Sequence, residues 1–171
     1  MRKLVLSWLL LLVSPIGLAS GPDAAIELIF AGIHFKIPAQ QEVIALGRGK
    51  QRFLIFKYGK RKGKEYLSFT DRSDDIHGLY GCEASKFYAR VFGTRETGEC
   101  KARDVAIYRA PMLSEKKKNG VWRGTNMTAY FSIGGRQSSI FVFQGSDKFI
   151  QIDSDFLDKE ALKGILVEYV Q

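Results

Sequence analysis

Short stretches in which apolar and polar residues alternate follow one another along the first half of the chain. Gly, Pro and charged residues separate them, which is the pattern of strands with one buried face. In residues 26–30 and 33–37 only Ala31-Gly32 interrupts the alternation, which predicts a hairpin. We expect a first meander in residues 42–46, 52–58 and 64–70, with the middle strand apolar enough to be covered on both faces.

The period of the pattern changes near residue 84. Apolar residues then recur at helical spacing and stop before Gly93: Ala84, Phe87, Tyr88 and Val91. Strand patterns return as a second meander in residues 104–109, 126–133, 138–144 and 149–152. A final helix is capped by Asp155 or Asp158 and has an apolar stripe of Leu162, Ile165, Leu166 and Tyr169. Residues 21–171 are therefore expected to form a single α+β domain, an antiparallel sheet of two meanders with a middle helix and a C-terminal helix packed on it.

Residues 1–20 have the organisation of a cleavable secretory signal peptide. Arg2 and Lys3 precede an apolar run from Leu4 to Val13, and small residues stand before a cleavage site after Ala19. The alternative is an uncleaved membrane anchor, although the run is shorter than the roughly 20 residues that cross a bilayer. We expect an exported protein, periplasmic or secreted, with no transmembrane segment once the signal is removed.

The two cysteines, Cys82 and Cys100, both lie in the expected mature chain. In an oxidising compartment such a pair predicts a disulfide. The alternative is a cysteine nucleophile assisted by His34 or His77.

The two ends of the domain resemble those of Mog1/PsbP-type domains. The resemblance is carried by Gly32-Ile33-His34-Phe35-Lys36-Ile37-Pro38 and by Phe149-Ile150-Gln151-Ile152-Asp153-Ser154-Asp155 followed by a helix. It implies an α+β fold and a binding module among exported and photosystem-associated proteins, and it assigns no functional residue.

Positive charge is concentrated in one segment. The chain has 26 Lys and Arg against 18 Asp and Glu, and loss of Arg2 and Lys3 with the signal lowers the net charge from +8 to +6. Residues 48–64 contain eight cations and no acid, and the candidate partner-binding residues among them are Arg48, Lys57, Lys60, Arg61, Lys62 and Lys64. A second cluster, Lys116-Lys117-Lys118, is expected in a loop from residue 114 to 120.

These two basic clusters favour an anionic envelope component or an acidic protein as partner. Nucleic acid is not expected outside the cytoplasm. The alternative is a solvated turn whose lysines protect a sheet edge.

Candidate chemistry is limited to one acidic loop. Asp71, Asp74, Asp75 and His77 could hold a cation or supply a base, but their spacing fits neither an EF-hand nor a zinc site. In the structural alternative Asp74 or Asp75 caps the turn and Asp71 pairs with Arg72. No cofactor or metal motif is present in the sequence.

The sequence therefore favours an exported, non-enzymatic binding protein that uses a basic hairpin, and an inhibitor or immunity protein is one specific form. The alternative is an envelope hydrolase with a site near Asp71, Asp75 and His77. The oligomeric state stays open.

Overall fold

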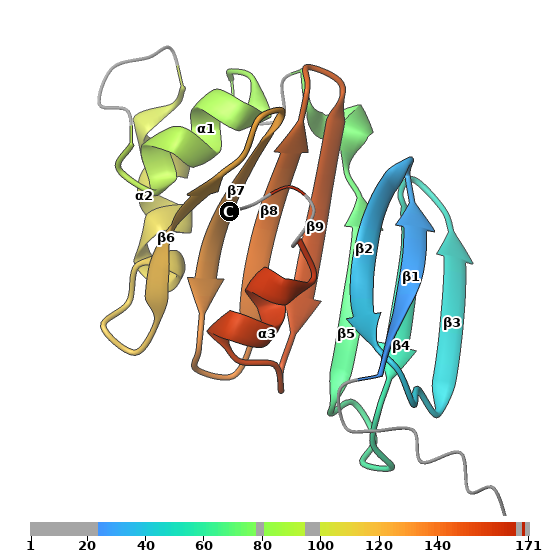
Figure 1. The fold of residues 1–171 in the computed structure, drawn as a ribbon. Helices are drawn as coiled ribbons and strands as arrows, with labels where there is room; N and C mark the ends of the chain where they lie inside the picture. Colours follow the sequence, from blue (N-terminus) through green and yellow to red (C-terminus); the bar gives the residue numbers. More distant parts are fainter. Residues whose placement is uncertain (1–23, 78–80, 95–99, 167–168, 170–171) are drawn as a thin grey trace, which may run out of the picture.

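One antiparallel sheet of seven strands organises the part of the chain that the computed structural model describes, residues 24–77, 81–94, 100–166 and 169 (Figure 1). Its strands are β3 (Val43–Arg48), β4 (Arg52–Lys57), β5 (Tyr66–Asp71), β6 (Lys118–Arg123), β7 (Met127–Ile133), β8 (Ser138–Gln144) and β9 (Lys148–Ser154). The expected signal peptide lies outside the described residues. Among the described helices, none has the length and apolar character needed to cross a membrane.

The strand order β3-β4-β5-β9-β8-β7-β6 shows how the two meanders combine. The first and last strands of the chain's second meander are β6 and β9, and β9 pairs with β5, with Leu67 opposite Ser154. The first meander therefore continues the second as one sheet. This confirms the α+β class with antiparallel pairing.

A separate hairpin, β1 (Ala25–Phe30) and β2 (Ile33–Pro38), packs on one face of this sheet. Its turn has positive φ at Ala31 and Gly32, 49° and 76°, as the tightest hairpin turns require. Alternate side chains of β2 point inward, so that Ile33, Phe35 and Ile37 are buried while His34 is exposed, as expected. Helix α3 (Lys159–Gly164) contributes Leu162 to the same core.

Two helices, α1 (Ala84–Val91) and α2 (Ala102–Met112), pack on the other face of the sheet (Figure 1). Tyr88 of α1 stacks on Phe141 of β8 with ring centroids 4.2 Å apart. The strand predicted in residues 104–109 is wrong, because this segment belongs to α2. Its buried and half-buried residues, Val105, Tyr108 and Met112, follow helical spacing, whereas Ile107 is 56 % exposed.

Two other expectations need correction. The basic loop expected up to residue 120 ends earlier, because β6 begins at Lys118. The strand expected to be covered on both faces, β4, is not, because α1 and α2 pack on side chains of the β6–β9 half. On the uncovered side of β4, Phe53 is 38 % exposed.

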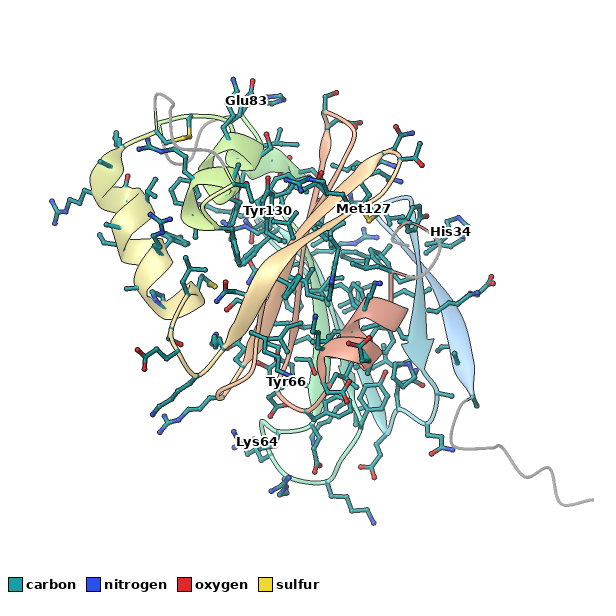
Figure 2. The ribbon with its side chains drawn as sticks, turned by 60° about the vertical axis from the view of Figure 1, so that its left-hand side comes forward. His34, Lys64, Tyr66, Glu83, Met127 and Tyr130 are labelled. Carbon is teal, nitrogen blue, oxygen red and sulfur yellow. A yellow bond between two sulfur atoms is a disulfide. The ribbon has the colours of Figure 1, made fainter. Side chains whose placement is uncertain are left out.

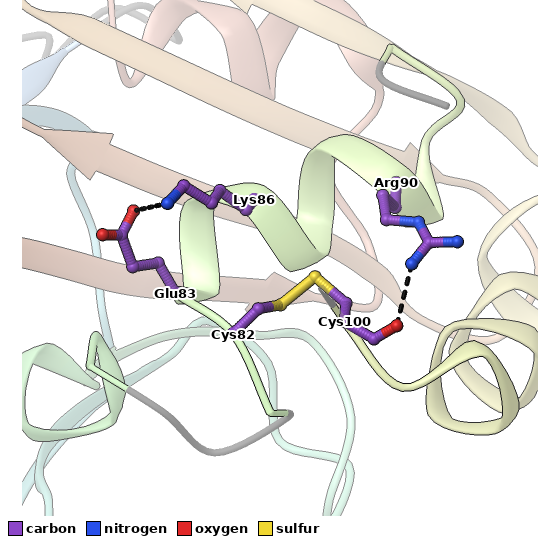
Figure 3. The surroundings of a disulfide bond; sticks show 5 residues. All are labelled: Cys82, Glu83, Lys86, Arg90 and Cys100. Carbon is purple, nitrogen blue, oxygen red and sulfur yellow. Dashed lines mark hydrogen bonds and ion pairs between the residues drawn. A yellow bond between two sulfur atoms is a disulfide. The ribbon is translucent and has the colours of Figure 1, made fainter. Parts of the chain in front are cut away.

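The expected disulfide joins Cys82 to Cys100, with Cα atoms 4.9 Å apart (Figure 3). Cys82 lies just before α1 and Cys100 just before α2, so the bond links the beginnings of the two helices. Arg90 Nη1 donates a hydrogen bond of 2.8 Å to the carbonyl oxygen of Cys100 and holds the end of α1 against the same segment.

Candidate functional site

The basic segment 48–64 is divided between the two ends of β4. Arg48 ends β3 and Lys50 lies in the turn from β3 to β4, whereas the cations from Lys57 onward belong to the turn from β4 to β5. Because neighbouring strands are antiparallel, these turns lie at opposite ends of the sheet. Arg48 is therefore separated from the other five predicted partner-binding residues.

Lys57 stabilises its own turn. Its Nζ donates hydrogen bonds to the carbonyl oxygens of Gly59, Arg61 and Lys64, the last two at 2.7 and 3.2 Å. An ammonium group that satisfies three carbonyl groups of one turn has little capacity left for a partner. The structure therefore gives Lys57 a role in shaping the turn.

The remaining cations of this turn differ in how far they are engaged. Arg61 Nη2 lies 2.8 Å from Glu65 Oε1, a hydrogen bond that raises the pKa of the guanidinium further, and Lys64 Nζ lies 4.0 Å from Asp155 Oδ2. Lys60 and Lys62 are exposed, and neither has an ion pair within the part of the chain described here. All four of these side chains are exposed, but among the described residues only Lys60 and Lys62 are without an ion pair.

The second basic cluster reaches this same end of the sheet. Lys118 pairs with Ile133 at the start of β6, and Ser138 at the start of β8 pairs with Ser154 at the end of β9. Ser154 in turn pairs with Leu67, near the start of β5. Figure 2 shows Lys64 and Tyr66 at this end and Glu83 at the other. The register thus brings together basic residues that lie far apart in the sequence.

A cleft of about 320 Å³ lies among these segments. Lys116 and Lys118 line one side of it, the turn from β7 to β8 a second side, and residues 155–159 the third. Phe156, 40 % exposed, supplies an apolar surface. We call the cations at this end of the sheet the basic end; they are the exposed Lys60, Lys62, Lys64, Lys116, Lys118 and Arg136, and the half-buried Lys159.

The carboxylates that line the cleft already have partners inside the protein. Asp155 Oδ1 accepts a 3.0 Å hydrogen bond from the backbone N–H of Tyr66, and only 5 % of its side chain is exposed. Asp158 Oδ1 accepts a 2.9 Å hydrogen bond from the N–H of Ala161 and caps α3, which confirms one of the two predicted caps. Their negative charges therefore stabilise local structure, and the charge presented outward is mainly that of the lysines.

Within the second basic cluster, Lys117 behaves differently from its neighbours. Lys116 and Lys118 are exposed, whereas Lys117 is half-buried. Burial lowers the pKa of Lys117, and the negative charge of Asp153 partly opposes this. Only the outer two lysines of the cluster belong to the basic end.

The acidic loop is held by arginines. Asp71, which is 8 % exposed, accepts hydrogen bonds from Arg52 and from Ser73, and Asp75 Oδ2 lies 2.7 Å from Arg72 Nη2. The expected pairing of Asp71 with Arg72 is therefore wrong, because Asp71 faces across the sheet to β4. Asp75 ends a short 3₁₀ helix, Ser73–Asp75.

His77 lies apart from these pairs. It lines a cleft of about 150 Å³ with Glu83 and Ser85, to which neither Asp71 nor Asp75 contributes. Across the described ranges no cluster of three or more His, Cys, Asp or Glu could hold a metal ion. The structure does not bring Asp71, Asp75 and His77 into one site, and a hydrolase centred on them stays a hypothesis.

Sequence reasoning missed three contributors to the basic end: Arg136, Lys159 and the aromatic Phe156. Arg136 follows the predicted Gly134-Gly135 turn, so a known strand register would have placed it. Lys159 and Phe156 follow the last strand, and no sequence pattern indicates which segments meet there.

In comparisons with protein-family models, curated proteins and solved structures, no match was found. The resemblance of the two ends to Mog1/PsbP-type domains therefore stays a prediction.

Proposed function

We propose that this chain is an exported, non-enzymatic binding protein whose basic end binds an acidic surface of a partner protein. An inhibitor or immunity protein that covers the active surface of a toxin or hydrolase is one specific form. The observation that carries the proposal is that two basic segments, residues 60–64 and 116–118, lie at the same end of the sheet. The second segment lines the cleft, and Lys64 of the first lies 4.0 Å from Asp155, which also lines it.

The composition of the basic end supports a protein partner. The exposed Lys116 and Lys118 and the half-buried Lys159 line a cleft that also contains the exposed ring of Phe156 and part of Ile133. Protein interfaces combine an apolar centre with a polar rim, and complementary charges at the rim accelerate association. A purely anionic polymer would use the lysines but not the ring.

The engaged state of the nearby carboxylates supports the same proposal. Asp155 and Asp158 accept hydrogen bonds from backbone N–H groups, and Asp155 also pairs with Lys64, so both carboxylates are already engaged. A partner that brings additional carboxylates can therefore pair with Lys116 and Lys118, for which no ion pair is present among the described residues.

The proposal is tested with polyglutamate as the acidic protein probe, beside phosphatidylglycerol vesicles and duplex DNA. We expect polyglutamate to bind, with affinity falling steeply between about 50 and 200 mM salt. The double variant Lys116→Glu/Lys118→Glu should abolish this binding. Phe156→Ala should leave polyglutamate binding unchanged. In the native envelope, however, Phe156→Ala should weaken the capture of protein partners by cross-linking.

The matched control reverses two cations at the opposite end of the sheet, Lys50→Glu/Arg123→Glu, which changes the net charge equally. This control should keep most of the affinity. Equal loss in both double variants would show an effect of net charge alone and would contradict the proposal. Binding to vesicles or DNA in preference to polyglutamate would contradict it as well.

A further inference from the structure

The outer edge of β3 is uncovered in the structure. β3 ends the seven-stranded sheet, and Figure 1 shows it at the margin of the molecule. Val43, Ile44 and Leu46 are 54, 58 and 65 % exposed. Proteins usually protect such an edge with Lys, Pro or a bulge that interrupts pairing. Between Val43 and Gly47 β3 has no charged residue and no proline.

The two ends of this edge have opposite charge. Glu42 immediately precedes β3, and its backbone N–H donates to the carbonyl oxygen of Lys57, which keeps it aligned beside β4. Arg48 is the last residue of β3. Both side chains are exposed, and no ion pair of either is present among the described residues.

We propose that β3 pairs antiparallel with β3 of a second copy of this chain, about a two-fold axis at Ala45, to give a continuous sheet across a dimer. This surface is distinct from the basic end. The inference goes beyond the proposed function and does not depend on it. A closed two-fold dimer requires a self-complementary edge, and the sequence of β3 provides one.

The register follows from the residues. With Ala45 opposite its own copy, Ile44 lies opposite the partner's Leu46, and Leu46 opposite the partner's Ile44. Glu42 then lies opposite the partner's Arg48, and Arg48 opposite the partner's Glu42. Moving the axis to a neighbouring residue loses both charge pairs. Directly opposed apolar and oppositely charged side chains are the pairs that stabilise antiparallel strands.

The other face of β3 fits the same register. Gly47 pairs with Phe53 of β4, and the Phe53 ring lies across it, so that a Cβ added at Gly47 would overlap the ring. In the proposed dimer the partner's Val43 lies opposite Gly47, where it meets this half-exposed ring. Aromatic cover of a glycine at a sheet edge is a known means of fixing register.

The opposite charges at the two ends favour a second copy over an unrelated acidic peptide. An acidic strand would be attracted at Arg48 and repelled at Glu42, whereas a second copy is attracted at both ends. A continuous edge also removes the unpaired backbone groups of both copies at once.

Sedimentation velocity of the purified, disulfide-bonded protein tests the dimer across a range of concentrations. We expect a reversible monomer–dimer equilibrium, and a monomer at every concentration for Leu46→Lys. The matched control is Ile107→Lys, which replaces another exposed apolar residue, 56 % exposed on α2, and should leave the dimer unchanged. Circular dichroism shows that each variant is folded.

Charge exchange tests the register itself. Glu42→Arg and Arg48→Glu should each weaken the dimer about tenfold, because each opposes like charges at two symmetric places. The double variant Glu42→Arg/Arg48→Glu should restore the wild-type dissociation constant. A wild-type protein that stays monomeric would overturn the proposal, and so would a dimer that Leu46→Lys does not affect. Single variants whose effects simply add in the double variant would overturn the register.

Discussion

Asp71→Asn is the substitution that separates a structural role of the acidic loop most clearly from a catalytic one. Asp71 Oδ1 accepts hydrogen bonds from the backbone N–H and the hydroxyl of Ser73, at 3.1 and 2.7 Å. Its Oδ2 accepts from Arg52 Nε at 3.1 Å and from the neighbouring Nη2. The carboxylate thus links the end of β5 to the start of β4.

The expected loss of stability follows from these contacts. A hydrogen bond to a charged group contributes about 1.5–3 kcal/mol to stability. The Arg52 side chain is 62 % exposed, so water replaces much of what it loses when the carboxylate becomes an amide. The amide oxygen also keeps part of the bonding to Ser73. We therefore expect the free energy of unfolding to fall by about 1–2 kcal/mol.

The effect should depend on pH in a defined direction. Burial alone would raise the pKa of Asp71, but hydrogen bonds from Ser73 and then Arg52 outweigh it, so the pKa lies below its ordinary value. A carboxyl group with a lowered pKa stabilises the folded state above its unfolded value of about 4, and this stability is lost as pH falls through the folded value. The difference between wild type and Asp71→Asn should be full near pH 7 and should shrink below about pH 4.

Urea unfolding with the disulfide intact, followed by tryptophan fluorescence, measures both proteins at neutral and acidic pH. Asp74→Asn is the matched control, because Asp74 is an exposed carboxylate in the same loop and its loss should change stability by less than about 0.5 kcal/mol. A difference for Asp71→Asn that stays constant or grows at acidic pH would refute the reasoning. Arg52→Gln should remove part of the same stability, and its effect should not add to that of Asp71→Asn.

Three further predictions concern the supports of the fold and of the basic end. Replacing Cys82 and Cys100 by Ser removes a link across 18 residues and should lower stability in urea by about 3 kcal/mol, whereas wild type in reductant should match the double variant. Asp158→Ala removes the cap of α3 and should cost about 1 kcal/mol in the same assay, with Asp158→Ser recovering most of it. Lys57→Met removes the donor to three carbonyl groups of its turn, so hydrogen exchange in residues 58–65 should accelerate while exchange in β8 stays unchanged.

Much of the secondary structure could be predicted because the buried faces are regular. The alternation in β2 and the helical spacing of Phe87 and Tyr88 each correspond to one covered face. The pattern failed in α2, whose covered side is narrow. Val105 is the buried residue of α2, whereas Ile107, two positions later, is exposed. Apolar residues two positions apart are also the spacing of a strand, so the sequence of this segment fits both structures.

The candidate site was predictable only in part, because it depends on which strands become neighbours. The basic segments were visible, but their meeting at one end depends on the pairing of β5 with β9. That pairing joins residues remote in the sequence, and local patterns carry no information on it. For the same reason Arg48 was grouped with Lys60 and Lys62, although a whole strand separates them in space.

The pairing of β5 with β9 also decides when the chain can finish folding. Ser68 and Asp153 lie side by side in the sheet although 85 residues separate them along the chain. Closing so long a loop costs entropy that is recovered only once both strands are present, and contacts of this kind slow folding. The edge of the amino-terminal meander therefore stays unpaired until β9, the last strand of the chain, is available. An unpaired strand edge can pair with the edge of another copy, so the unfinished chain must be kept apart from other copies until β9 is in place.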